Sequence, residues 1–390
     1  MTATDNNLRI LLVGPVPPPY GGIPVYVQNL LNSRMASMDL CLFNTALPGW
    51  VAPLNREGQS HYKSLSESGV WVSIKMIFYV LLSYPRFLVR LLTLRPAIVH
   101  VFTCSYWGYW RSWLYLLLAK ACGRKNIFHL LNAIDVFHGA VNERQKKWIE
   151  RSLNSAHQYL VQSPGLQKWV QQYSRRRVLG IWNGLHLDRI PPKQPGAPDA
   201  MPRAMGIGVT VGGPSRNKGT YDLLDVLATL RQQQVDVAWV FVGGGDLGKF
   251  RALTEQKGVA DRVVFAGSVD DEEKWQYLHH ADFFSLPSYA EGRPIAILEA
   301  MAVGLPVIST AIGSISEVVE DGRSGIILAP GDKKALAEAI ARMTVNTEER
   351  REMGTAAREG IPERHDIRDL FDGLRNVYRE LCAETKRRPA

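Results

Sequence analysis

Short apolar runs, each followed by a turn-forming segment and then a helical stretch, recur along the chain and constrain its fold more than any other feature. Residues 8–13 form an apolar run in which only Arg9 is charged, a glycine- and proline-rich loop follows, and residues 23–32 have a helical pattern. Uninterrupted apolar runs are typical of strands buried on both faces of a parallel sheet. Strand, glycine loop and helix together form the first unit of a doubly wound α/β fold. Similar runs lie at residues 97–102, 126–131, 159–161, 178–182, 208–211, 237–242, 263–265, 283–286 and 307–310.

The alternation occurs in two halves, which predicts two domains. A chain of 390 residues fits that number at roughly 100–200 residues per domain. Residues 191–198 hold four prolines and no periodic pattern, which is typical of a linker. We therefore expect an N-terminal domain over residues 1–190, a linker over 191–204, a C-terminal domain over 205–366 and a last helix within 367–390.

One window of the second half, residues 291–317, places two carboxylates around the start of a predicted helix. Glu291 lies in a turn, and Glu299 follows eight residues later on the helix. Unpaired N–H groups and the helix dipole at such a start attract a phosphate, and Glu299, about one turn on, could reach a ribose hydroxyl. The residues of the turn and helix start, expected to bind a charged ligand, are Gly292, Arg293, Pro294 and Ile295.

The order E-G-x-P-(x4)-E-A-M-A-x-G-x-P-V-I-x-T-(x2)-G-(x3)-E in this window resembles the donor-site signature of retaining glycosyltransferases of the GT-B fold, family 4 (glycosyl transferases group 1). The resemblance implies two Rossmann-like doubly wound domains facing a central cleft, with the C-terminal helix crossing back to the first domain. The first domain would bind the acceptor and the second the nucleotide sugar. An ordinary loop, helix and strand is the alternative interpretation of the window.

The implied activity is transfer of a hexosyl or N-acetylhexosaminyl group from a nucleotide-diphosphate-sugar donor to a hydroxyl of a glycan acceptor, with retention at the anomeric carbon. Glu291 would be catalytic, holding the donor sugar or its reacting face. No metal and no cofactor are expected, because cationic side chains and the helix start would stabilise the leaving diphosphate.

Residues 211–219 resemble the family's V-G-R-L-(x3)-K-G segment, whose Arg and Lys neutralise the donor diphosphate. Lys218 and Gly219 match the pattern, but Gly213 stands at the position of the Arg. We hypothesise that Arg216 supplies the second charge and that Lys218 is catalytic. Solvated loop charges are the alternative for both side chains.

Further glycine loops follow predicted strands and are expected to line the donor site. Gly21 and Gly22 follow the first strand, and Gly244 follows the strand at 237–242. Glycine lets the backbone approach a phosphate or sugar closely. Similar segments of the resembling family line the nucleotide pocket, so the resemblance implies that Ser268 and Val269, after the strand at 263–265, lie near the base and that backbone groups hold it.

The family usually has a histidine after the strand equivalent to residues 126–131. His129 is the candidate here, with a catalytic role, although the usual spacing would place the histidine at about Leu131. His129 is therefore either catalytic or a core histidine, in which case Asn132 or Asp135 would take the polar role. The residues expected near the acceptor are Tyr20, Asn132 and Asp135.

Charge is distributed unevenly, which bears on the partner of the first half. Residues 1–199 contain 22 Lys and Arg against 9 Asp and Glu, whereas the whole chain has 46 against 37. Val70–Leu94 is apolar, but Lys75, Arg86 and Arg90 interrupt it and Pro85 should kink it, so it falls short of the ~18–20 uncharged residues of a spanning helix. With the aromatic side chains of residues 106–113, it predicts a basic amphipathic surface lying on an anionic bilayer. Core packing, or a solvated basic surface without a partner, is the alternative.

The expected acceptor is therefore a lipid-linked glycan of surface polysaccharide or glycoconjugate biosynthesis, and the expected location is the cytoplasm, peripheral at the inner face of the cytoplasmic membrane. The four cysteines form no C-x-x-C pair, which suggests a reducing compartment. The N-terminal residues lack the pattern of a signal peptide.

Other chemistries find little support in the sequence. It contains no H-E-x-x-H, D-x-D, G-x-S-x-G or complete Walker A sequence, and no recognisable nucleic-acid module. A sugar-nucleotide epimerase of GT-B fold and a non-catalytic sugar-nucleotide-binding subunit remain alternatives to the transferase. The departure at Gly213 and the uncertain position of the histidine keep the second of these open.

Overall fold

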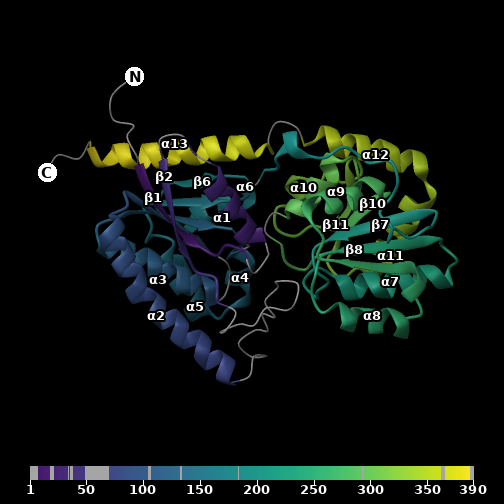
Figure 1. Cartoon of the computed structure of the whole chain (residues 1–390), viewed down its shortest axis with the longest axis horizontal. Coiled ribbons are helices and arrows are strands. Elements are labelled where there is room, and N and C mark those ends of the chain that lie inside the picture. Colours follow the sequence, from purple (N-terminus) through teal and green to yellow (C-terminus); the bar gives the residue numbers. More distant parts are fainter. Residues whose placement is uncertain are drawn as a thin grey trace. The chain divides into compact units, whose positions relative to one another are not determined.

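The computed structural model describes residues 8–17, 22–33, 35, 38–48, 70–103, 107–131, 134–182, 184–291, 294–361 and 365–386 (Figure 1). The chain divides into two compact units. The first comprises Met1–Trp182 together with Asp369–Ala390, and the second comprises Asn183–Arg368. Each unit is an α/β domain built on one six-stranded sheet. This is the predicted fold class of two doubly wound domains.

The sheet of the first unit is parallel and has the strand order β2-β1-β3-β4-β5-β6. Its strands are β1 (Leu8–Gly14), β2 (Met38–Asn44), β3 (Ile98–Thr103), β4 (Lys125–Leu130), β5 (Gln158–Val161) and β6 (Val178–Gly180). Its helices are α1 (Gly22–Asn32), α2 (Val70–Leu94), α3 (Trp107–Ala121), α4 (Ile134–Ala140), α5 (Glu143–Ser152), α6 (Pro164–Tyr173) and α13 (Ile367–Lys386).

The strand β2 was not among the predicted strands. It lies at the edge of the sheet and pairs only with β1 among the described strands. None of its residues is fully buried, and it mixes polar Asp39 and Asn44 with apolar residues. An edge strand does not need the uninterrupted apolar run on which the prediction relied.

The sheet of the second unit is also parallel and has the order β12-β11-β10-β7-β8-β9. Its strands are β7 (Gly206–Val211), β8 (Val237–Val242), β9 (Val263–Gly267), β10 (Phe283–Leu286), β11 (Val307–Thr310) and β12 (Gly325–Leu328), of which β12, again at an edge, was not predicted. Its α-helices are α7 (Thr220–Gln232), α8 (Leu247–Gln256), α9 (Asp271–His280), α10 (Ile295–Ala302), α11 (Lys333–Val345) and α12 (Thr347–Glu359).

The last helix, α13, packs on the first unit, as expected for a C-terminal helix that crosses back (Figure 1). The hydroxyl of Tyr378 on α13 lies 2.6 Å from Nδ1 of His100 on β3. Arg177 also forms an ion pair with Glu380 at 2.7 Å. Tyr378 and His100 are both fully buried, so this contact belongs to the core of the unit.

The boundary between the units differs from the predicted linker at residues 191–204. The structure divides the chain at Trp182, and the proline-rich segment belongs to the second unit. Side chains of α9 hold that segment: Gln276 donates to the carbonyl oxygen of Pro192 at 3.1 Å, and His279 contacts that of Pro191 at 2.7 Å. Proline lacks an N–H group but keeps its carbonyl oxygen as an acceptor. Side chains of a helix can therefore bind a proline-rich segment even though that segment has no periodic apolar pattern.

The aromatic cluster that was expected on a membrane surface lies mostly in the core. Tyr109 on α3 is 1% exposed, and Trp110 and Trp113 are partly buried against the core of the first unit. Trp107 is exposed, and Tyr106 lies outside the described residues. The helix α2, by contrast, runs without a break through Pro85. Most of the aromatic side chains of α3 therefore pack in the core, as the alternative interpretation expected.

Candidate functional site

Three glycine turns follow neighbouring strands of the second unit and lie at one edge of its sheet. Gly212, Gly243 and Gly267, at the ends of β7, β8 and β9, all have positive φ, at 119°, 138° and 76°. The N–H of Gly212 donates to the carbonyl of Val242, and that of Gly243 to the carbonyl of Gly267, both at 2.7 Å. Ligands of open parallel sheets bind at the carboxyl ends of the strands, so this edge is where a site is expected.

The backbones of two of these turns touch, and this contact explains the departure at Gly213. A Cβ atom on Gly213 would lie 2.0 Å from the carbonyl oxygen of Gly244. A Cβ on Gly243 would likewise lie 2.7 Å from the backbone of Gly212 and Gly213. An arginine cannot occupy position 213 in this arrangement without moving the Gly244 turn, so any second cation must come from another position.

The ammonium of Lys218 lies directly over the end of β7. A Cβ on Gly212 would be only 1.8 Å from Lys218 Nζ, which places the side chain across that glycine. Lys218 lies in the turn before α7, where the next residue, Gly219, has a φ of 68°. The sequence-predicted cation is therefore at the carboxyl edge of the sheet, as the match of Lys218 and Gly219 implied.

Glu291 lies near this lysine, at the end of the loop that follows β10. The loop is joined to the Lys218 turn, because the N–H of Tyr289 donates to the carbonyl of Asn217 at 2.7 Å. Ser288 Oγ donates to Glu291 Oε1 at 3.2 Å. Burial raises the pKa of Glu291, while the charge of Lys218 and the Ser288 hydrogen bond partly oppose that rise. The structure thus brings together two of the three residues that were predicted to be catalytic.

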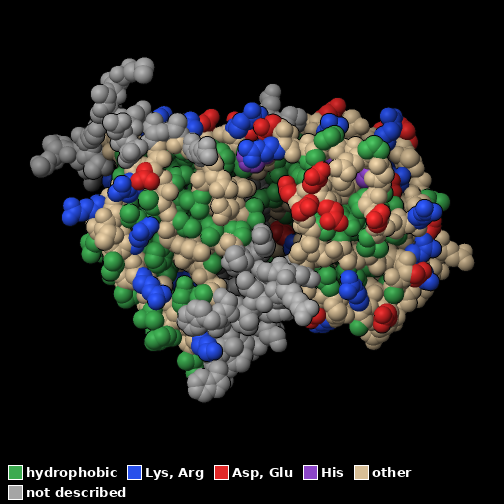
Figure 2. All heavy atoms as spheres, in the orientation of Figure 1, with side chains coloured by type: hydrophobic (Ala, Val, Ile, Leu, Met, Phe, Trp, Pro, Cys, Tyr) green, Lys and Arg blue, Asp and Glu red, His purple; other side chains and the backbone are tan. Residues whose placement is uncertain are grey.

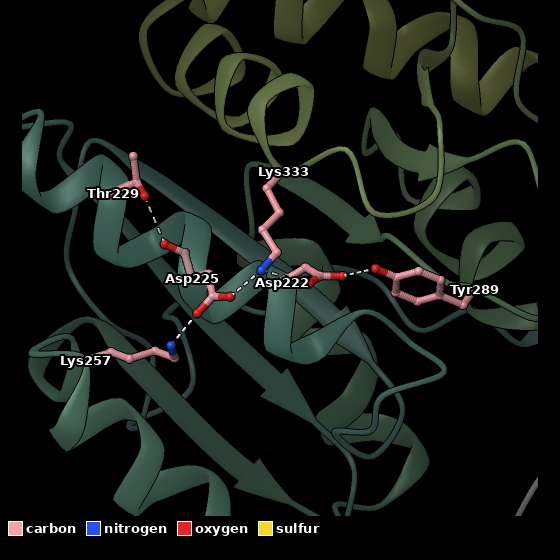
Figure 3. A network of polar contacts seen from close by, with 6 residues as sticks. All are labelled: Asp222, Asp225, Thr229, Lys257, Tyr289 and Lys333. Atoms are coloured by element: carbon pink, nitrogen blue, oxygen red, sulfur yellow. Dashed lines mark hydrogen bonds and ion pairs between the residues drawn. The ribbon is translucent and has the colours of Figure 1, made fainter.

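A polar network supports the Glu291 loop from outside the sheet edge (Figure 3). The hydroxyl of Tyr289 donates to Asp222 at 2.5 Å. Lys333 Nζ contacts Asp222 at 3.3 Å and Asp225 at 2.5 Å, and Lys257 also pairs with Asp225. These residues come from α7, α8 with its following turn, α11 and the loop after β10. Sequence analysis missed them, because no short-range pattern joins positions so far apart along the chain.

Glu299 has a partner that the sequence did not indicate. Its carboxylate, in a residue 8% exposed on α10, forms an ion pair with Lys274 of α9 through Oε1 at 2.7 Å. Lys274 also contacts Asp271 at 2.5 Å. Burial lowers the pKa of Lys274, but the two carboxylates outweigh it and raise the pKa overall. A ribose hydroxyl would have to share Glu299 with this lysine.

Arg216, the hypothesised second cation, rests on an aromatic ring. Its Cζ lies 4.4 Å from the ring centre of Tyr221, at the start of α7. Lys249 Nζ, from the first turn of α8, lies 5.7 Å from the same ring centre. A hydrogen bond with Tyr221 raises the pKa of Lys249. Two cations therefore gather at the Tyr221 ring, and sequence analysis did not single out one of them, Lys249.

The start of α10 has the geometry expected for binding an anion. Pro294 occupies the N-cap position with a φ of −71°, and no side chain of the described residues caps the start of the helix at Ile295. Unpaired donors and the helix dipole favour negative charge there. The preceding turn residues Gly292 and Arg293 lie outside the described residues.

The remaining predicted donor and acceptor residues lie at element ends. Ser268 is exposed and Val269 half-buried just after β9, Gly22 begins α1 with open space beside its Cα, and Asp135 is half-buried in the first turn of α4. Gly244 follows β8 and faces Gly213. Tyr20, Gly21 and Asn132 lie outside the described residues.

His129 lies in the core of the first unit. It is 0% exposed, and its Nδ1 lies 3.1 Å from Nε2 of His100, which in turn contacts Tyr378. The ring of Tyr26 packs edge-on against His129 at 5.4 Å. Burial lowers the pKa of His129 to about 3. This geometry corresponds to the core alternative, since a histidine enclosed by other side chains does not contact a substrate.

Part of the second unit matches the model of a known protein family. Residues 207–360 match the family described as "Glycosyl transferases group 1". This range contains the Lys218 turn, the Glu291 loop and α10, which are the elements that carry the candidate site.

Several curated proteins resemble the chain over part of its length. The amylovoran biosynthesis glycosyltransferase AmsK of Erwinia amylovora is 34% identical, covering 33% of this chain and 34% of that protein. A GDP-mannose-dependent alpha-(1-6)-phosphatidylinositol monomannoside mannosyltransferase of Mycobacterium tuberculosis is 33% identical, covering 37% and 40%. The phosphatidyl-myo-inositol mannosyltransferase of Mycobacterium leprae is 27% identical, covering 64% of each. The chain spans between about a third and two thirds of the length of these relatives.

Solved structures share the fold over almost the whole chain. A sucrose-phosphate synthase from Thermosynechococcus elongatus has a TM-score of 0.72 at 19% identity and covers 96% of this chain and 99% of its own. The structure of Anabaena HepE in complex with UDP and glucose has a TM-score of 0.67 at 18% identity and covers 96% and 100%. At this identity the likeness establishes the fold, which is GT-B.

Proposed function

We propose that this protein, which has a GT-B fold and matches the glycosyl transferases group 1 over residues 207–360, transfers a sugar from a nucleotide-diphosphate donor to a hydroxyl of a glycan acceptor. The observation that carries the proposal is the meeting of Lys218 and Glu291 at the carboxyl edge of the second sheet. The ammonium of Lys218 suits the diphosphate, and the carboxylate of Glu291 suits a sugar hydroxyl.

The chemical requirement of such a transfer is stabilisation of the departing diphosphate. Lys218 and the uncapped start of α10 both present positive charge at the sheet edge. Preorganised groups of this kind act on charge that develops in the transition state and need no reorganisation at that moment. The proposal therefore assigns the compensation of charge to protein groups and includes no metal.

Glu291 is assigned to the donor sugar. Ser288 holds its Oε1, and burial keeps its pKa above the ordinary value, so a hydrogen bond to a neutral sugar hydroxyl suits its surroundings. Because no second carboxylate is paired with Glu291 as a nucleophile in this proposal, the acceptor attacks from the face that the diphosphate leaves. That course retains the anomeric configuration.

The donor is a sugar linked to a nucleoside diphosphate. The complexes of HepE contain UDP, and the named mannosyltransferase of M. tuberculosis depends on GDP-mannose, so relatives use more than one base. We propose a hexosyl or N-acetylhexosaminyl group, with the base held by backbone groups after β9. Glu299 lies on α10, the helix that follows the Glu291 loop, and there Glu299, paired with Lys274 of α9, would meet the ribose.

The acceptor is a lipid-linked glycan in the biosynthesis of a surface polysaccharide or glycolipid. The names of the relatives include amylovoran biosynthesis and phosphatidyl-myo-inositol. The excess of positive charge in residues 1–199 suits a phosphate-containing acceptor. We propose that the protein works in the cytoplasm, at the inner face of the cytoplasmic membrane.

The test is a thermal-shift panel of UDP, GDP, ADP and dTDP with their common sugar conjugates, followed by product analysis. A ligand at ~100 times its Kd stabilises the fold by about 2.7 kcal/mol. We expect a selective shift that Lys218→Ala abolishes and that Lys334→Ala, an exposed lysine on α11, leaves unchanged. Absence of a shift with every nucleotide would contradict the proposed donor site, and isomerisation of the sugar by donor alone would identify an epimerase.

A further inference from the structure

The helix α2 exposes a continuous apolar face. Large apolar side chains on this helix are between 39% and 62% exposed, and they recur at helical spacings of three, four and seven residues, which places them along one side. Patches of this kind on a folded protein mark sites of interaction with another protein or a membrane. The side chains are Ile74, Ile77, Phe78, Leu81, Val89 and Leu92, with Leu82 beside them.

The opposite face of α2 is fixed in the core of the first unit. Phe87 and Leu91 are 0% exposed and belong to the main apolar cluster of the unit. Phe87 packs edge-on against Phe43 of β2 at 5.2 Å between ring centres. Ser83 Oγ lies 2.5 Å from the hydroxyl of Tyr115 on α3. The helix is therefore a permanent part of the fold that leaves one side uncovered among the described residues.

This anchoring excludes a spanning role for α2 in the folded protein. By length and composition alone, Ser73–Leu94 could cross a membrane. Crossing would withdraw Phe87 and Leu91 from the core and break the contact between Ser83 and Tyr115. A helix with one face in the protein and one face apolar lies along an interface.

The charges on α2 select among the possible occupants of its outer face. The helix contains Lys75, Arg86 and Arg90, all exposed, and no acidic residue. Figure 2 shows Lys and Arg side chains interspersed with hydrophobic ones along the edge where α2 runs in Figure 1. Long basic side chains cover apolar surface with their stems and present their charges at the level of lipid headgroups.

A second copy of the chain fits this face less well. A two-fold contact sets the same patch against itself. The three cations of one helix would then face the three of the other, and α2 has no carboxylate to pair with them. An anionic lipid surface offers both apolar depth and opposite charge.

We propose that the outer face of α2 docks the first unit on the surface of an anionic bilayer, with the helix lying in the plane of the interface. Phe78, Leu81 and Val89 enter the acyl boundary, while Arg86 and Arg90 contact lipid phosphates. This proposal deepens the proposed function. It rests on that function only for the purpose of docking, which is to bring the protein to a lipid-linked acceptor at the bilayer surface. Docking itself requires neither donor nor acceptor.

The experiment is flotation of the purified full chain with vesicles, without nucleotide. One set contains phosphatidylcholine with a third of phosphatidylglycerol, and the other phosphatidylcholine alone. We expect binding to the anionic vesicles, weakened by high salt. The double variant Arg86→Gln/Arg90→Gln should weaken it about fivefold per cation removed, and Phe78→Gln/Leu81→Gln should abolish it in low salt.

The matched control is Met205→Gln/Val345→Gln, which changes two side chains of the second unit that are 60% and 65% exposed. The control should bind as the parent chain does, and every variant should keep the parent's melting temperature, because all the altered side chains are exposed. Failure of the parent chain to bind anionic vesicles, or equal binding by the α2 variants, would overturn the proposal.

Two further readouts separate this proposal from its competitors. A dimer in light scattering that Phe78→Gln/Leu81→Gln dissociates, without vesicle binding, would show that the face binds a second copy. A selective nucleotide shift without vesicle binding would contradict the docking surface alone. Vesicle binding without any nucleotide shift would support docking and contradict the proposed transferase site instead.

Discussion

The hydroxyl of Tyr289 donates a hydrogen bond to the carboxylate of Asp222 at 2.5 Å, and this contact ties the loop that carries Glu291 to the first turn of α7. Lys333 holds the same carboxylate from the start of α11. A hydroxyl two residues before Glu291 is thus fixed by groups from two other segments. The position of Glu291 relative to Lys218 depends on this anchorage as well as on the local loop.

Removing the Tyr289 hydroxyl should therefore loosen the Glu291 loop. We expect Tyr289→Phe to lower kcat by roughly tenfold, because small misplacements of positioning groups have large kinetic effects. Since Tyr289 is 43% exposed, the free energy of unfolding should fall by no more than about 1 kcal/mol. Steady-state kinetics and urea denaturation measure the two effects. Tyr173→Phe, in the first unit, is the control, and equal kcat values for the two variants would refute the positioning role.

Replacing Lys218 tests the assignment of the leaving group. We expect Lys218→Ala to lower kcat by about 10²–10³-fold, which is the typical effect of removing one preorganised electrostatic contact. Stability should change little, because the ammonium lies over a glycine turn rather than in the apolar core. Single-turnover kinetics with the donor identified by thermal shift would measure the chemical step. Lys334→Ala serves as the control, and a rate within threefold of the parent's would remove Lys218 from the catalytic residues.

Restoring the family arginine at position 213 should damage the site instead of improving it. A Cβ there would lie 2.0 Å from the carbonyl oxygen of Gly244, so Gly213→Arg must displace the β8 turn. We expect a loss of about 1–3 kcal/mol in the free energy of unfolding, as for other overpacked positions, together with weaker donor binding. Gly139→Ala, whose added Cβ would meet nothing within 4 Å, should be harmless. Tighter donor binding by a stable Gly213→Arg would disprove the steric explanation.

The buried pair of Lys274 and Glu299 should be sensitive to removal of one partner. Lys274→Met leaves the carboxylate of Glu299, whose side chain is 11% exposed, without its cation. Breaking a buried ion pair in this way destabilises a protein by roughly 3–5 kcal/mol. The double variant Lys274→Met/Glu299→Gln should recover most of that loss. Urea denaturation of the parent, Lys274→Met, Glu299→Gln and the double variant closes the cycle, and additive effects would show that the two groups do not interact.

The buried histidines should make the first unit sensitive to acid. Burial lowers the pKa of His129 to about 3 and that of His100 well below its ordinary value, so both stay neutral in the folded state. The unfolded chain binds protons at these groups below pH ~6.5, so stability falls as the pH decreases from about 6.5 towards 3. Each histidine contributes a slope of up to about 1.4 kcal/mol per pH unit.

The measurement is the free energy of unfolding of the first unit's transition between pH 7 and pH 4.5. His129→Gln, which keeps a polar group beside His100, should flatten the dependence by up to that slope. His186→Gln, which changes a partly exposed histidine of the second unit, should flatten it less. An unchanged pH dependence in His129→Gln would contradict the neutral buried state.

Much of the fold follows from local patterns. The central strands were predicted because strands covered on both faces need nearly continuous apolar runs, as in β3, where all six residues are buried and only His100 and Thr103 are polar. The edge strand β2 escaped prediction because it mixes polar Asp39 and Asn44 with apolar residues, and β12 was missed although Gly325–Leu328 is apolar. The unit boundary was misplaced because carbonyl contacts with Gln276 and His279 of α9, which are distant in sequence, hold the proline-rich segment.

The candidate site divides in the same way. The sequence by itself determined the identity and spacing of Lys218, Glu291 and Glu299, because turn chemistry and helix starts depend on neighbouring residues. Only the tertiary structure decided that Gly213 has no room for a side chain, that Lys274 pairs with Glu299 and that His129 is enclosed with His100. It also decided that one side of α2 is exposed while Phe87 and Leu91 are buried. Such contacts join residues far apart along the chain, and they exist only when packing of the two sheets and their helices has brought those residues together.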